Sequence, residues 1–138
     1  MNNDTKKFEV LEHPADLKIR AWGKDLKEVF TNMALGMMQS IKSNAQGAAR
    51  TEHEVKISSI NRESLLIDFL SELLYLVEIN REVYSKIEIT QLSEKYLQAK
   101  LYGVKARGFD LEIKAVTYGG EEVRRGGGGW EAVVIFDI

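Results

Sequence analysis

The chain of 138 residues contains no cysteine, a single proline and no long apolar run. The absence of cysteine excludes disulfides, thiol nucleophiles and thiolate zinc sites, and a reducing compartment is the natural setting for such a chain. No apolar run approaches the ~18 residues that a membrane span requires, and the N-terminal residues MNNDTKKFEV lack the apolar core of a secretory signal. We therefore expect a cytoplasmic protein that has no membrane partner.

The chain also lacks a strong excess of charge of either sign. Its formal net charge is −2 and its isoelectric point is near 5.8. These values argue against a protein that binds nucleic acid through a broad basic face, although they do not exclude a local basic patch. The length and the hydrophobic content of 44% predict one globular domain over residues 1–138, large enough to bury its own core.

The stretch from Phe8 to Gly23, FEVLEHPADLKIRAWG, alternates apolar and charged residues on both sides of an acidic corner. This alternation predicts two strands with one buried face. Pro14 has no N–H for a sheet ladder and biases His13 toward extended geometry, so the chain is expected to leave the sheet there. His13 and Asp16 should then lie on a connection, which is a position that can hold chemistry.

Two apolar stripes with three- and four-residue steps predict helices over about residues 25–41 and 62–79. The first begins with a D-x-x-E signal at Asp25, and its three methionines are interpreted as gap-filling core. The second has the wider stripe and is expected to be central. Asp68 and Glu72 lie on its polar side at an i, i+4 spacing, and we favour an exposed acidic face over metal ligands there.

Period-two alternation returns elsewhere in the chain and predicts five further strands. The glycines at 126–129 are expected to form a mobile loop, and no G-K-[ST] follows them to support phosphate binding of the Walker type. The predicted fold class is α+β, a two-layer single domain with a mostly antiparallel sheet packed against the two helices. The five strands cover about residues 54–60, 83–89, 97–101, 109–118 and 130–138.

The last strand ends in a carboxylate beside the last residue of the sequence. Where the chain ends at Ile138, Asp137 and the α-carboxylate place two negative charges within one residue. Three explanations stay open at this point: a solubilising tail, an ion pair with a lysine such as Lys114, or a metal site. The first two are favoured by spacing alone.

Four ordered blocks of the sequence resemble the archease family, the small protein partners of the GTP-dependent tRNA-splicing RNA ligase. They are FEVLEHPADLKIRAWG at the start, SLLIDFLSELLYLVE in the second helix, EIKAVTYGG in the penultimate strand and W-x-A-V-V-I-F-D-I at the end. Together they span nearly the whole chain, and their order makes the resemblance specific.

The resemblance implies an α+β two-layer fold and a divalent cation, Ca²⁺ in the first place, with Mg²⁺ or Mn²⁺ as alternatives. Residue by residue, it carries the cation ligands over to Asp16, Asp137 and the main chain of Ile138. Hard oxygen donors suit these cations and disfavour zinc or copper(I). The family's functional lysine corresponds to Lys114, which would either steady a nucleotide phosphate or neutralise Asp137.

Some positions depart from the family pattern. The corner usually reads H-T-A-D, and Pro14 here replaces the threonine; the penultimate strand usually ends Y-H, and Gly119 here follows Tyr118. His13 is a candidate functional residue, although a hydrogen-bonded corner residue is the favoured interpretation. His53 is expected to be solvated at a strand edge.

The resemblance implies an accessory role and no catalysis by this chain. The ligase would be guanylylated on a histidine, transfer GMP to an RNA 3′-phosphate and then join the 5′-hydroxyl end, while this protein promotes guanylylation and repeated turnover. tRNA would be contacted only indirectly, through the ligase. Two alternatives stay open: a chaperone or modulator of a tRNA-modifying enzyme such as a tRNA methyltransferase, and a metal-dependent hydrolase, for which the sequence offers no convincing general base.

Overall fold

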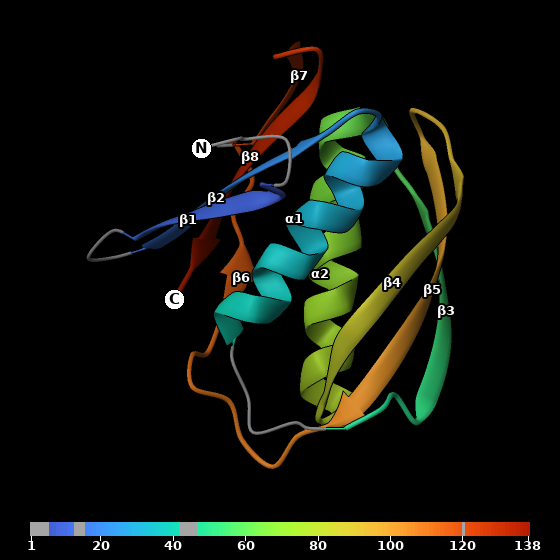
Figure 1. Cartoon of the computed structure of the whole chain (residues 1–138), viewed down its shortest axis with the longest axis vertical. Helices are drawn as coiled ribbons and strands as arrows, with labels where there is room; N and C mark the ends of the chain where they lie inside the picture. Colours follow the sequence, from blue (N-terminus) through green and yellow to red (C-terminus); the bar gives the residue numbers. More distant parts are fainter. Residues whose placement is uncertain (1–5, 13–15, 42–46, 120) are drawn as a thin grey trace.

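A computed structural model of the chain describes residues 6–12, 16–41, 47–119 and 121–138. Two helices and eight strands follow one another in it (Figure 1). In chain order they are β1 (Phe8–Glu12), β2 (Asp16–Gly23), α1 (Leu26–Ile41), β3 (Thr51–Ser58), α2 (Arg62–Asn80), β4 (Glu82–Leu92), β5 (Tyr96–Lys105), β6 (Ala115–Val116), β7 (Glu122–Gly126) and β8 (Gly129–Asp137).

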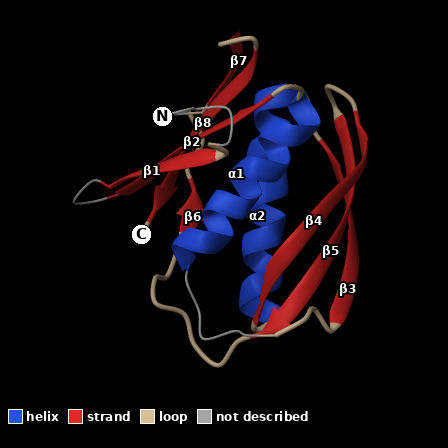
Figure 2. Ribbon diagram, viewed as in Figure 1, coloured by secondary structure: helices blue, strands red, loops and turns tan. Residues whose placement is uncertain are grey.

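The strands divide between two antiparallel sheets, and the helix pair lies between them (Figure 2). The five-stranded sheet has the order β1-β2-β8-β6, with β7 also paired to β8, and the three-stranded sheet has the order β3-β5-β4. Both helices contact strands of both sheets. The predicted α+β class with two helices and antiparallel strands is confirmed, and the division into two sheets is a feature that the periodicities did not reveal.

Side-chain caps fix the start of each helix. The Asp25 carboxylate accepts a hydrogen bond from the Glu28 amide at 2.8 Å, and the Asn61 side chain accepts one from the Ser64 amide at 2.8 Å. Each bond satisfies an amide that has no partner within its own helix. The predicted helices are therefore confirmed to within one residue at either end.

One continuous core fills the space between the sheets and around the helices. Met33, Met37 and Met38 are all buried in it, which confirms that the methionine stripe of α1 is packing rather than an exposed surface. Among the described residues, no helix is long and apolar enough to cross a membrane.

The strand predicted over residues 109–118 is wrong for most of its length, because within this segment only Ala115–Val116 form a strand, β6, among the described residues, and Phe109 makes an isolated bridge. The amides of Asp110 and Leu111 instead donate to the carbonyl of Ile41, each at 3.1 Å. They occupy a carbonyl at the end of α1 that has no helical partner. The alternation of apolar residues here reflects packing against a helix end, not a sheet ladder.

The glycines at 126–129 form a tight hairpin instead of the expected mobile loop. Gly126 pairs with Gly129, and Gly127 and Gly128 have φ values of 60° and 82°. Two successive positive φ values are characteristic of the type I′ turn that joins two-residue β-hairpins. Strand β7, which was not predicted, thereby pairs with β8.

Candidate functional site

The first residue of β2 lies opposite the last residue of β8. In the register of this antiparallel pair Asp16 faces Asp137, and the next pair along is Leu17 with Phe136. Side chains directly opposite one another project from the same face, with their Cβ atoms about 4.5–5.5 Å apart. Two carboxylates from opposite ends of the sequence therefore meet at one end of the five-stranded sheet, which we call the acidic edge.

Alternation along the two strands decides which way these carboxylates face. Leu17 and Phe136 are buried in the core, so their neighbours Asp16 and Asp137 project from the outer face of the sheet. Asp137 is exposed and Asp16 is partly exposed. Ile138 packs against the core as a partly buried side chain, which leaves its main chain beside Asp137.

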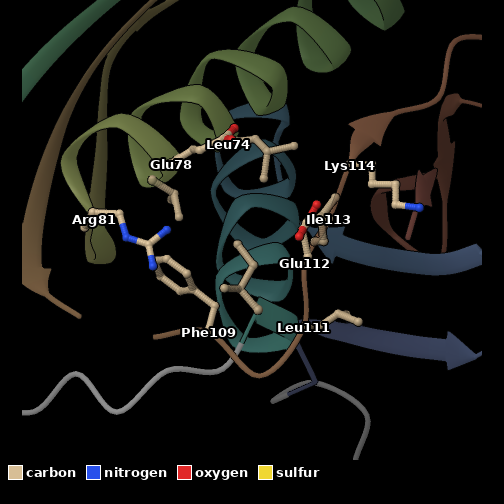
Figure 3. A pocket seen from close by; sticks show the side chains of 10 residues that line it. Leu74, Glu78, Arg81, Phe109, Leu111, Glu112, Ile113 and Lys114 are labelled. Carbon is tan, nitrogen blue, oxygen red and sulfur yellow. The ribbon is translucent and has the colours of Figure 1, made fainter. Parts of the chain in front are cut away.

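Lys114 joins this edge through its backbone. Its amide donates to the carbonyl of Asp137 at 2.7 Å, one residue before the pairing of Ala115 with Asp137. No ion pair forms between Lys114 and Asp137 in the structure, although both residues are described. The Lys114 side chain is exposed and lies on the far side of the view from Arg81 and Phe109 (Figure 3).

Three residues of the predicted corner, 13–15, lie outside the described residues, so a role for His13 stays a prediction. Asp16, which was expected on the connection, is instead the first residue of β2. Gly119 is described and has a positive φ of 98°, a backbone conformation that favours glycine over the usual histidine.

The donor set of the acidic edge fits a hard divalent cation. Asp16 and Asp137 form no ion pair with any residue that the structure describes, so their mutual repulsion has no cationic side chain to offset it. The described part of the chain holds no group of three or more His, Cys, Asp or Glu side chains that could bind a metal. A cation held here would thus need the Ile138 main chain as a third oxygen donor.

A cavity of about 380 Å³ lies beside this edge, between the C-terminal ends of both helices and the segment before β6. The Arg81 guanidinium stacks over the Phe109 ring at 4.6 Å to the ring centre (Figure 3). Glu78 and Glu112 also line the cavity, with Lys114 at one end. Its mixed charges and its open mouth give it no resemblance to a dry catalytic pocket.

A buried polar cluster in the three-stranded sheet was missed by sequence reasoning. His53 Nε2 lies 2.9 Å from Glu82 Oε1, and the Tyr84 hydroxyl donates to the same oxygen at 3.2 Å. Glu82 is only 1% exposed, so His53 is not simply solvated as expected. Burial disfavours the charged carboxylate, but the facing Thr51, His53 and Tyr84 side chains outweigh it and lower the pKa of Glu82.

Asp68 has protein partners as well and is partly buried, so it does not lie on an exposed acidic face as expected. It accepts hydrogen bonds from the Ser59 hydroxyl at 2.9 Å and from the Tyr118 hydroxyl. The bond to Asp68 raises the pKa of Tyr118 to about 12. The pair fastens the turn after β6 to helix α2.

Comparison with known proteins assigns the chain to a family. Residues 8–138 match the model of the Archease protein family. The protein archease of Methanosarcina mazei is 40% identical over the full length of both chains, and that of Pyrococcus furiosus is 35% identical over 96% of this chain and 99% of its own.

Solved structures agree with this assignment. The solution structure of Methanobacterium thermoautotrophicum protein 1598 is 32% identical, with a TM-score of 0.78 over 97% of this chain and 100% of that one. A Thermotoga maritima crystal structure, described as an archease and possible chaperone, is 20% identical, with a TM-score of 0.65 over 94% of this chain and 96% of that one, and shows the fold alone. The chain belongs to the archease family.

Proposed function

We propose that this protein is an accessory activator of the GTP-dependent tRNA-splicing RNA ligase. It would promote guanylylation of the ligase and allow each ligase molecule to turn over repeatedly in tRNA splicing or RNA repair. The ligase would carry out the chemistry, and the acidic edge of this protein would dock transiently at the ligase active site. The family assignment and the pairing of Asp16 with Asp137 support this proposal.

The acidic edge is suited to such docking because its charge is not offset within the protein. Asp16, Asp137 and the main chain of Ile138 would hold a divalent cation, most favourably Ca²⁺, with Mg²⁺ and Mn²⁺ as alternatives. The bound cation would supply the positive charge that lets the carboxylates approach each other and an anionic partner. Lys114 forms no ion pair with Asp137, which favours the other role implied for it, a point charge for a nucleotide phosphate.

The proposal is tested by ligation of an RNA that bears a 2′,3′-cyclic phosphate. The cognate ligase is supplied well below the RNA concentration with GTP and Mn²⁺, and the reaction is run without this protein, with the wild type and with Asp137→Asn. We expect several products per ligase with the wild type but not with Asp137→Asn or without this protein. Asp110→Asn is the matched control, because Asp110 is an exposed carboxylate that is not paired with β2 or β8 and whose amide binds the end of α1, and it should activate like the wild type.

Two outcomes would contradict the proposal in different ways. Equal product in all reactions would remove ligase activation and favour the alternative, a chaperone or modulator of a tRNA-modifying enzyme such as a tRNA methyltransferase. The relative from Thermotoga maritima carries the description of a possible chaperone. Activation that survives in Asp137→Asn would keep the accessory role but remove the acidic edge from it.

The cation is tested separately by calorimetric titration with Ca²⁺, Mg²⁺ and Mn²⁺. We expect binding heats with the wild type and none with Asp16→Ala/Asp137→Ala, because the two side chains supply most of the donor oxygens. Equal heats from both proteins would remove the metal site.

A further inference from the structure

The opposite end of the same two strands opens into a wide cleft. Strand β8 has nine residues, so its first residue lies about 27 Å from Asp137 along the strand. The cleft has a volume of about 1050 Å³ and is formed by the chain before β1, the end of β2, the start of α1 and the hairpin between β7 and β8. It is lined by Lys6, Lys7, Glu9, Trp22, Gly23, Lys24, Glu28, Asn32, Gly126–Gly129 and Trp130.

Few cationic side chains at this cleft form ion pairs within the protein. Among the described residues, Lys7 and Lys24 of the lining form none, and Lys6 pairs with Glu9 at 3.1 Å. Arg125, next to the lining residue Gly126, also forms no ion pair, although its guanidinium lies over the Trp130 ring. The other acidic residue of the lining, Glu28, turns its carboxylate toward the backbone amide of Lys24 at 3.3 Å. The cleft therefore offers positive charge to a ligand, although the whole chain is weakly acidic.

Both tryptophans of the chain line this cleft, and each has a cation over its ring. The Lys6 ammonium lies 5.6 Å from the Trp22 ring centre. The guanidinium groups of Arg62 and Arg125 lie 4.9 Å and 5.0 Å from the Trp130 ring centre. Cation–π contacts of this kind hold the charged groups beside flat surfaces, on which a nucleobase can stack.

One wall of the cleft carries no side chains at all. The hairpin residues 126–129 are all glycine: Gly127 and Gly128 have positive φ values, and at Gly129 an added Cβ would collide with the backbone of Gly23 and Lys24. Bare backbone gives a planar base or a phosphate close access and leaves amide groups open to it. This wall ends at Trp130, so the bare hairpin adjoins an aromatic ring.

We propose that this cleft binds single-stranded RNA, with the unpaired cations on its phosphates and the tryptophan and arginine planes beside its bases. Unpaired positive charge combined with aromatic rings is the pattern of sequence-tolerant single-strand binding. An acidic peptide would use the charge but not the rings. The choice of RNA over DNA rests on the proposed function, and a direct RNA contact goes beyond the indirect one expected from the sequence.

Intrinsic fluorescence tests the proposal directly, because both tryptophans of the chain lie in the cleft. The full-length protein, without ligase, is titrated with a single-stranded RNA of about ten nucleotides, within the usual site size. We expect saturable quenching. The logarithm of the binding constant should fall against the logarithm of salt concentration with a slope near −2, as expected for about three phosphate contacts.

Matched triple variants locate the contacts, with affinity measured by anisotropy of a labelled RNA. Lys7→Gln/Lys24→Gln/Arg125→Gln should bind at least tenfold more weakly and lose most of the salt slope. Lys56→Gln/Lys86→Gln/Lys95→Gln removes the same charge from exposed positions on β3, on β4 and in the turn between β4 and β5, and should bind within twofold of the wild type. Both variants are first checked for an unchanged unfolding midpoint.

Three results would overturn the proposal: no quenching by RNA, an equal loss of affinity in both triple variants, or displacement of RNA by polyglutamate of matched charge. The last would identify the cleft as a surface for an acidic protein. Guanylylation of the ligase is measured in parallel without RNA, so that failure of RNA binding and failure of ligase activation are scored independently.

Discussion

The two ends of the five-stranded sheet and the Glu82 cluster of the three-stranded sheet treat their charged side chains in opposite ways. In the three-stranded sheet Glu82 is buried, but His53 and Tyr84 engage the same carboxylate oxygen. At the ends of the five-stranded sheet Asp137 and Lys24 are exposed and form no ion pair within the described chain. Charges satisfied inside the protein should govern its stability, and charges left without partners should govern what it binds.

The largest loss of stability should come from a position without any side chain, Gly103 in β5. A Cβ atom there would lie 2.5 Å from Thr51 Oγ1, 3.1 Å from Tyr84 Cε1 and 3.2 Å from Glu82 Cδ. The strand passes against the buried cluster so closely that only glycine fits. Gly103→Ala should lower the free energy of unfolding by about 3 kcal/mol, the upper end for overpacking, as measured by urea denaturation.

Gly108→Ala is the control for this prediction, because nothing lies within 4 Å of the added Cβ and the backbone is not in the left-handed region. It should leave the free energy of unfolding unchanged within about 0.5 kcal/mol. Equal losses from the two substitutions would show that close packing at Gly103 is not the cause.

Removal of the Glu82 charge should cause the next largest loss of stability. Glu82→Gln keeps the shape but removes the ionic partner of His53, so it should cost about 2 kcal/mol at pH 7. Because the folded protein lowers the pKa of Glu82 from 4.5, this contribution is complete above pH 4.5 and is lost as the pH falls through the folded value. Urea denaturation at pH 7 and at a pH below 4.5 should therefore show a smaller difference between wild type and variant at the lower pH.

Glu88→Gln serves as the control, because Glu88 is an exposed carboxylate on the same strand. It should change the free energy of unfolding by less than about 0.5 kcal/mol at either pH. If the loss of stability in Glu82→Gln does not depend on pH, ionisation of Glu82 does not contribute to it. That result would weaken the comparison between the sheets.

The sequence predicted the features that depend on residues close together in the chain. The helix starts follow from Asp25 and Asn61, whose side chains cap amides three residues away. The bounds of β2 and β8 follow from alternation, but alternation carries no information on which strands pair. The grouping of Asp16 with Asp137 therefore came from the family resemblance, and the observed register is consistent with it.

The failures share a physical cause, which is long-range contact. His53 and Glu82 are 29 residues apart and each looks like a surface charge in its own strand. Gly103 was the available signal, because a glycine inside a strand marks a close approach by other atoms. Strand β7 was missed because its two arginines and flanking glycine show little of the apolar period that predicts strands.

Tyr118 is intermediate between the buried Glu82 cluster and the exposed charges without ion pairs. Its partner is within the protein, but its side chain is 60% exposed. Tyr118→Phe removes the hydrogen bond to Asp68 and should cost about 1 kcal/mol, the typical net value for one bond. Tyr75→Phe, an exposed tyrosine on α2, should cost less than about 0.5 kcal/mol. Thermal unfolding of both variants checks this order, and equal costs would mean that the Asp68 contact adds nothing.

The smallest change in the free energy of unfolding should be an increase, not a decrease. With chelator present, Asp137→Asn removes one of two carboxylates that face each other, and relief of that repulsion should raise the free energy of unfolding by about 0.2–1 kcal/mol. Adding Ca²⁺ should reverse the order, because a cation that binds only the folded wild type stabilises it by mass action. Differential scanning calorimetry in chelator and in Ca²⁺ measures both. A variant less stable than wild type in chelator would mean that Asp137 is satisfied within the protein, and the acidic edge would then resemble the buried cluster instead of contrasting with it.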